Sequence, residues 1–131
     1  MIPTYRAAFS GDPRNVPLAR NAIASFARLC GFSLDEVGDI RLAAGEALSN
    51  AVEHGASSRS NGFSVLCIFE NDELTIEIRD NGVGFAPDDR IAAPIEERNR
   101  GFGIYLMRRL MDAVQFDRNG TLVRLMRRHE A

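Results

Sequence analysis

Residues 63–80 constrain the fold most, because they contain two strand-like segments separated by a short polar turn. The first segment, FSVLCIFE at 63–70, is largely apolar on both faces, which is typical of a strand inside a sheet. The second, LTIEIRD at 74–80, alternates apolar and polar residues, which is typical of a strand with one buried face. Asn71 and Asp72 favour a turn between them. We therefore predict two adjacent strands.

The alternation places a carboxylate on the buried face of the second strand. Leu74, Ile76 and Ile78 share one face, and by the same parity Asp80 lies on it as the strand ends. A carboxylate among apolar side chains needs a partner. One explanation is an Asx turn, since Asp-Asn-Gly is common turn chemistry. The other is a ligand: Asp80 could accept a hydrogen bond from the adenine amino group and repel the guanine carbonyl, a discrimination of about 1.5–3 kcal/mol.

Two helices are predicted before these strands. Apolar residues recur at helical spacing over 16–29, and Gly31 is expected to end that helix. Ser33 and Glu36 have the spacing of a capping box, which predicts a second helix that ends near Gly55. The other expected elements are a strand at 4–9, a helix at 102–112 and strands at 113–116 and 122–126.

The second helix carries a line of polar residues within GEALSNAVEHG at 45–55. Glu46, Asn50 and His54 are four residues apart and therefore share one face of the helix. Asn50 could give an oxygen to Mg²⁺, and Glu46 could accept a proton from a nucleophile that attacks a γ-phosphate. A half-buried seam of i,i+4 hydrogen bonds explains the same spacing. For His54 we favour a structural place at the helix end.

The longest irregular stretch, 81–101, has the length of a lid or binding loop, and a pair of glycines lies at each of its ends. Gly82 and Gly84 would let the backbone approach a flat ligand closely. Gly101 and Gly103 precede the helix expected at 102–112, whose N–H groups and dipole would favour a phosphate. Tight turns explain both pairs equally well.

The basic residues exclude two ways of holding a nucleotide. All sixteen are Arg, so the lysine of a P-loop or of an ordinary protein kinase is missing. Phosphates would have to be held by backbone N–H groups, a metal or arginines such as Arg100 or Arg98, which lie beside Gly101. The net charge of −2 gives no electrostatic case for nucleic acid. Since we find no membrane-spanning run and no signal peptide, we expect a cytoplasmic protein.

Four segments in order along the chain resemble one known family. They are AAGEALSNAVEHG, IRDNGVGF, RGFGIYLMRRLMD and GTLVRLM. The chain resembles the GHKL (Bergerat-fold) ATPase superfamily, and within it the anti-sigma factor serine/threonine kinases of the RsbW and SpoIIAB type. The resemblance implies a single domain over 1–131 with the α/β (α+β) two-layer sandwich of that fold. Its sheet would be mixed, mainly antiparallel, and covered on one face by three helices.

The resemblance also implies roles for individual residues. Glu46 would be the general base and Asn50 the Mg²⁺ ligand. Asp80 would bind the adenine amino group, supported through water by Thr121, which strand parity also places on the buried face. The implied glycine positions are Gly82 and Gly84 in the adenine pocket and Gly101 and Gly103 at the phosphate-facing end of the lid. The implied cofactors are ATP and Mg²⁺.

The partners implied by the family are a sigma factor and an anti-sigma-factor antagonist with a STAS domain, with the kinase as a homodimer. No direct nucleic acid or membrane partner is expected. Arg14, Arg20 and Arg28 could form a contact face on the first helix, or merely a solvated one. One rival function is an ATP-binding partner switch with little kinase activity. Another is a catalytic domain cut from a longer histidine kinase or a phosphatase-linked regulator, although Met1 and the late last strand favour a free-standing chain.

Overall fold

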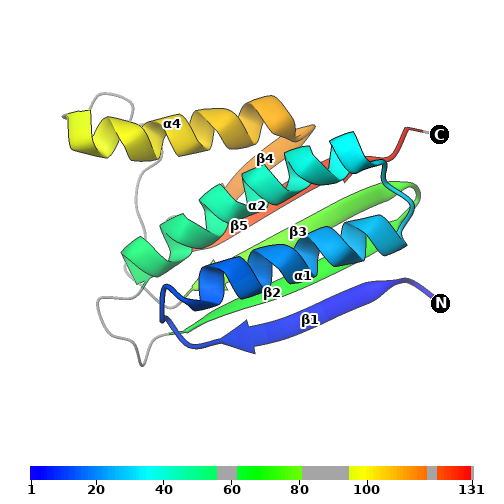
Figure 1. Ribbon diagram of the computed structural model, residues 1–131, viewed down its shortest axis with the longest axis horizontal. Coiled ribbons are helices and arrows are strands. Elements are labelled where there is room, and N and C mark those ends of the chain that lie inside the picture. The colour runs from blue at the N-terminus through cyan, green and yellow to red at the C-terminus, as the bar shows by residue number, and fades with distance from the viewer. Residues whose placement is uncertain (56–61, 81–94, 118–120, 131) are drawn as a thin grey trace.

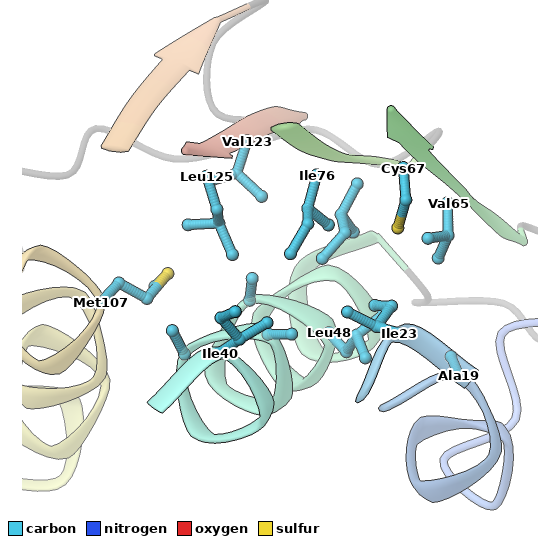
Figure 2. Packing of buried hydrophobic residues seen from close by; sticks show 14 of the residues in the cluster. Ala19, Ile23, Ile40, Leu48, Val65, Cys67, Ile76, Met107, Val123 and Leu125 are labelled. Atoms are coloured by element: carbon cyan, nitrogen blue, oxygen red, sulfur yellow. The ribbon is translucent and has the colours of Figure 1, made fainter. Parts of the chain in front are cut away.

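The computed structural model describes residues 1–55, 62–80, 95–117 and 121–130, and it places three helices on one face of a five-stranded sheet (Figures 1 and 2). The elements are β1 (Thr4–Phe9), α1 (Asn15–Leu29), α2 (Leu34–Gly55), β2 (Phe63–Glu70), β3 (Glu73–Asp80), α4 (Ile95–Leu110), β4 (Ala113–Asp117) and β5 (Leu122–Arg128). The expected two-layer sandwich is thereby confirmed. No helix within the described ranges has the length and hydropathy to cross a membrane.

The sheet has the strand order β1-β2-β3-β5-β4, and each of its four strand pairings is antiparallel. The sheet was expected to be mixed, mainly antiparallel, and no parallel pair occurs among the described strands. β2 and β3 form the predicted hairpin through Asn71 and Asp72, whose φ angles of 54° and 60° are both positive. Asn and Asp tolerate this left-handed conformation better than other side chains, which explains why they occupy the turn.

The core lies between the helices and the inward face of β2, β3 and β5 (Figure 2). Small residues on α1 and α2 allow the two helices to approach each other and the sheet closely. The fully buried residues at the centre of the core include Ala19, Ile23, Ile40, Ala44, Leu48, Val65, Cys67, Ile76, Met107 and Leu125. On α2 they form an apolar stripe, and this stripe orients Asn50 and Glu46.

The C-terminus of α1 and the N-terminus of α2 are as predicted. Gly31 ends α1 with a φ of 100°, and the N–H of Phe32 donates to the carbonyl of Ala27 in a Schellman arrangement. Ser33 and Glu36 form a reciprocal capping box at the start of α2. The N–H of Ser33 donates to Glu36 Oε1 at 2.9 Å, and the N–H of Glu36 donates to Ser33 Oγ at 3.2 Å.

The prediction for the last helix was wrong at its N-terminus. α4 begins at Ile95 instead of residue 102 and ends at Leu110. The segment IEERNR at 95–100 consists mostly of good helix formers, and a glycine flanked by such residues weakens a helix without ending it. Gly101 and Gly103 therefore lie inside α4, where they do not form the free helix N-terminus that was expected to face a phosphate.

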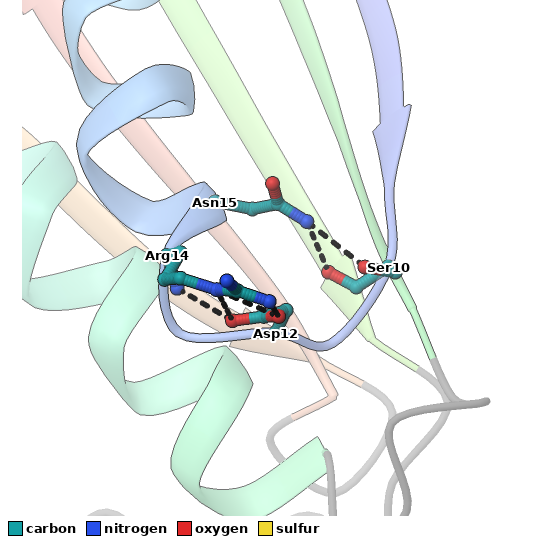
Figure 3. Close-up of polar contacts among 4 residues, drawn as sticks. All are labelled: Ser10, Asp12, Arg14 and Asn15. Carbon is teal, nitrogen blue, oxygen red and sulfur yellow. Dashed lines mark hydrogen bonds and ion pairs between the residues drawn. The ribbon is translucent and has the colours of Figure 1, made fainter.

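The connection between β1 and α1 is held by side-chain hydrogen bonds (Figure 3). Asn15 Nδ2 donates to the carbonyl oxygen and to Oγ of Ser10, at 3.1 and 2.9 Å. The backbone N–H and the guanidinium of Arg14 both donate to the carboxylate of Asp12. The start of α1 is thus fixed relative to the edge strand β1.

Candidate functional site

The structure brings Asn50 and Asp80 into one small cavity between the helices and the sheet. Its free volume is about 10 Å³, roughly enough for one water molecule. The lining residues come from α2, α4 and three strands: Ala47, Asn50, Ala51, Ile78, Asp80, Met107, Phe116 and Val123. Two residues predicted from separate motifs, 30 positions apart, therefore lie at one site. Sequence reasoning missed Met107 and Phe116, which periodicity marked only as apolar.

Asn50 is buried with an unsatisfied amide. Its side chain is 7% exposed, and Nδ2 has no hydrogen-bond partner among the described residues. Burying an unsatisfied polar group costs about 1–3 kcal/mol, so such a group is typical of a position that meets a ligand. α2 orients Asn50 because the apolar residues around it, Ala47 and Ala51, face the core.

The donor set at Asn50 fits Mg²⁺ that is bound together with a nucleotide. Mg²⁺ prefers oxygen ligands, and in nucleotide sites it takes one or two from the protein and others from phosphates and water. Rotation of the Asn50 side chain can present either its oxygen or its nitrogen. The described residues contain no cluster of three or more His, Cys, Asp or Glu that would hold a metal without phosphates.

Asp80 and Thr121 lie side by side at the end of β3. Asp80 is 7% exposed, and its N–H donates to the Thr121 carbonyl at 2.9 Å. The register pairs Ile78 with Val123, so Thr121 faces the same side of the sheet as Asp80. The predicted position of Asp80 on the buried face and the predicted neighbourhood of Thr121 are both confirmed.

Glu46 lies one helical turn before Asn50 and faces α4. It is half-buried and does not line the cavity. Burial, and secondly the negative charge of Glu53, raise the pKa of the Glu46 carboxyl above its ordinary value. A carboxyl with a raised pKa is a stronger base once ionised, which suits proton transfer near neutral pH.

Gly82 and Gly84 lie outside the described residues, and so do the side chains of Arg100, Arg98 and His54. The backbone at Gly101 is helical, within α4.

The predicted row of arginines on α1 is only partly exposed. Arg14 and Arg28 are exposed, but the stem of Arg20 packs on Gly45 of α2, and its Nε is buried without a hydrogen-bond partner among the described residues. An Arg stem covers apolar surface readily, which explains why sequence pattern alone misjudged this position.

A wide hollow lies on the other side of the sheet, away from Asn50 and Asp80. Its volume is about 570 Å³, and strand residues such as Arg6, Ser64 and Arg79 line it. Arg124 Nε donates to Glu77 Oε2 at 3.0 Å on the same face. No described helix covers this polar face, as the sequence predicted, and it is an open depression without buried site residues.

Three helices on one face of an antiparallel sheet, with a buried Asn and a buried Asp between the two layers, make this a two-layer α+β protein. The chain belongs to the histidine kinase-like ATPase domain family, whose sequence profile matches residues 9–127.

Curated relatives of this chain share most of its length. It is 31% identical over 114 residues to the anti-sigma F factor of Oceanobacillus iheyensis, covering 82% of this chain and 78% of the relative. It is 29% identical over 114 residues to the anti-sigma F factor of Clostridium acetobutylicum, covering 83% and 80%. A Thermoanaerobacter anti-sigma F factor is 28% identical over 125 residues, covering 89% and 87%.

Proposed function

We propose that this protein is an ATP-dependent serine/threonine protein kinase that acts as an anti-sigma factor in a partner-switching system. It would phosphorylate a serine of a STAS-type antagonist and sequester a sigma factor. The observation that carries the proposal is the burial of Asp80 and of the unsatisfied Asn50 amide in one cavity. The anti-sigma F factor relatives support the choice of partners.

Each described site residue has a chemical task in this proposal. Bound Mg·ATP would supply the phosphoryl group, and the charge of its Mg²⁺ would orient the phosphates. Asp80 accepts a hydrogen bond from the adenine amino group, with Thr121 beside it, and Asn50 offers the protein oxygen for the metal. Glu46 accepts the proton from the attacking serine hydroxyl.

The cavity at Asn50 and Asp80 must widen to admit the adenine ring, because its free volume is that of about one water molecule. Met107 is the wall residue best suited to move, since an unbranched thioether side chain repacks easily. Phe116 supplies an apolar surface on the β4 side.

The remaining parts of the proposal rest on resemblance to the family. Gly82 and Gly84 shape the adenine pocket, and Gly101 lies at the phosphate-facing end of the lid. A phosphate contact from Arg100 or Arg98 rests instead on their place beside Gly101 and on the absence of lysine. The protein acts in the cytoplasm as one domain over 1–131 and as a homodimer.

A second candidate is an ATP-binding partner switch with little kinase activity. One observation favours it: Glu46 packs toward α4 and is absent from the lining of the cavity that holds Asn50 and Asp80. In that case nucleotide binding would change affinity for partners without phosphoryl transfer.

The two candidates differ in one experiment. The protein is incubated with γ-labelled ATP, Mg²⁺ and antagonist proteins encoded nearby, and the label is followed to a serine by mass spectrometry. A kinase labels the antagonist, and its Glu46→Gln variant binds ATP with unchanged affinity but transfers about 10²–10⁴-fold more slowly. Nucleotide-dependent antagonist binding without any label would support the passive switch.

A further inference from the structure

The side chain that lies nearest to Gly103 in α4 is that of Glu46 in α2. A Cβ atom built on Gly103 would lie 2.6 Å from Glu46 Oε2, 3.5 Å from its Cδ and 3.8 Å from its Cβ. The first distance is shorter than any non-bonded contact that a real Cβ makes. The Glu46 carboxylate therefore occupies the space that a side chain at position 103 would fill.

This contact is specific among the helical glycines that the structure describes. Gly38 in α2 has no atom within 4 Å of an added Cβ, and Gly45 would meet the stem of Arg20 at 3.1 Å. Only at Gly103 is the neighbour a candidate catalytic group. Because glycine weakens a helix interior relative to alanine, a glycine at this buried place needs a reason, and the carboxylate supplies one.

α4 is well anchored at this point, so its backbone can act as a fixed wall. Ile104, the residue next to Gly103 on the same helix, is fully buried against the core. The wall that Glu46 meets is thus held by packing independent of the carboxylate.

We propose that Gly103 is a positioning residue for the general base: its missing side chain forms the seat in which α4 holds the Glu46 carboxylate. This rests on the proposed function of Glu46, and it assigns Gly103 to the base instead of to the phosphates.

A methyl group at position 103 should displace the carboxylate without unfolding the protein, because the nearest atom is the end of a flexible side chain. Among the described residues the charge that acts on Glu46 is Glu53, on α2, while α4 presents uncharged backbone at Gly103. Displacement toward water would reduce the burial that raises the pKa of Glu46 and so lower that pKa.

The test compares Gly103→Ala with Gly38→Ala, the same change at an uncrowded helical position. Both should keep or raise the melting temperature and bind Mg·ATP within about twofold of wild type. Phosphoryl transfer should fall by about 10²-fold in Gly103→Ala alone, the typical effect of a small misplacement. In a Glu46→Gln background, Gly103→Ala should cause no further loss of transfer. An ATP affinity that falls with unchanged transfer would overturn the proposal in favour of phosphate contact.

A second readout does not depend on kinase activity. The pKa of Glu46, assigned by comparison with Glu46→Gln, is followed by carboxyl carbon NMR and should fall in Gly103→Ala but not in Gly38→Ala. An unchanged pKa of Glu46 in Gly103→Ala would overturn the proposed positioning role of Gly103. If no antagonist is labelled even by the wild type, the kinase proposal fails while this result still decides the position of Glu46. Should Gly103→Ala be unstable, Glu46→Ala must restore its melting temperature; failure to restore it also counts against the seat.

Discussion

Two polar side chains, Asn50 and Asp80, are buried where neighbouring residues are apolar. Both are 7% exposed and line the same cavity, yet they come from different motifs and different elements. Apolar residues at these positions would avoid the desolvation of a carboxylate and an amide. At the scale of single residues, we propose that a ligand accounts for their presence, with Asp80 as its hydrogen-bond acceptor and Asn50 as a source of a metal-binding oxygen.

Replacing Asp80 with Asn should weaken ATP binding and reduce the preference for ATP over GTP. The amide can no longer accept two hydrogen bonds as a charged group, and its NH₂ can donate to the guanine carbonyl. Loss of a charged hydrogen bond of about 1.5–3 kcal/mol corresponds to roughly 10- to 100-fold in ATP affinity. Isothermal titration calorimetry with both nucleotides measures this, with exposed Asp35→Asn as control. Equal affinities in wild type and variant would refute the adenine contact.

Asn50→Ala should remove the Mg²⁺ dependence of nucleotide binding. The variant loses the oxygen proposed for the metal, and the stability of the ligand-free protein should change little because the amide has no partner on Nδ2. Titrations of the protein with ATP, once in the presence of Mg²⁺ and once in EDTA, measure this dependence. Asn21→Ala, at an exposed position of α1, serves as the control. A dependence that persists in Asn50→Ala would mean that another group binds the metal.

At the scale of elements, helix starts are decided by different forces in α2 and α4. The capping box of Ser33 and Glu36 is local, and hydrogen bonding to Ser33 is the main cause that lowers the pKa of Glu36. α4 instead begins at Ile95 and continues through Gly101 and Gly103, although glycine is a weak helix former. The good helix formers of 95–100 favour its start, and the buried residues Ile104 and Met107, which pack in the core, favour its continuation past the glycines.

Ser33→Ala should destabilise the protein by about 1 kcal/mol, the usual cost of losing an N-cap side chain. The variant leaves the N–H of Glu36 without its Oγ acceptor, while the reciprocal bond from Ser33 N–H remains possible. Chemical denaturation followed by circular dichroism gives the free energy of unfolding. Ser25→Ala, on the exposed side of α1, controls for the loss of a hydroxyl. Equal stability of Ser33→Ala and wild type would show that the cap contributes nothing.

At the scale of the whole molecule, the C-terminal residues connect the two layers. The N–H of His129 donates to the Asp72 carbonyl in the β2–β3 turn at 2.7 Å. Its ring lies 4.9 Å from that of Phe32, in the connection between α1 and α2, and 6.4 Å from that of Phe69. His129, the residue that follows β5, thus joins the α1–α2 connection to the turn of the β2–β3 hairpin.

His129→Ala should lower the free energy of unfolding by about 1–2 kcal/mol, because the variant loses the ring contacts with Phe32 and Phe69. The slope of the denaturation curve should stay the same, since the whole chain still unfolds as one unit. Exposed Glu130→Ala is the control, and ATP affinity should not change in either variant because the site lies elsewhere. A loss of ATP affinity in His129→Ala would contradict this separation.

Much of the architecture could be predicted from local sequence. The alternation over 74–80 determined which face Asp80 would occupy, and the capping box determined where α2 begins, because both depend on residues close in the chain. Strand parity likewise predicted that Thr121 lies on the same face of the sheet as Asp80.

Only the tertiary structure decided what meets across elements. That Asn50 and Asp80 share a cavity, that α4 extends through its glycines, and that Gly103 faces Glu46 depend on how α2, α4 and the sheet pack together. Such contacts join residues far apart in the chain, and periodicity states which face is buried but not what lies opposite. The sequence by itself therefore determined the elements and the candidate residues, whereas packing determined which of them stand together.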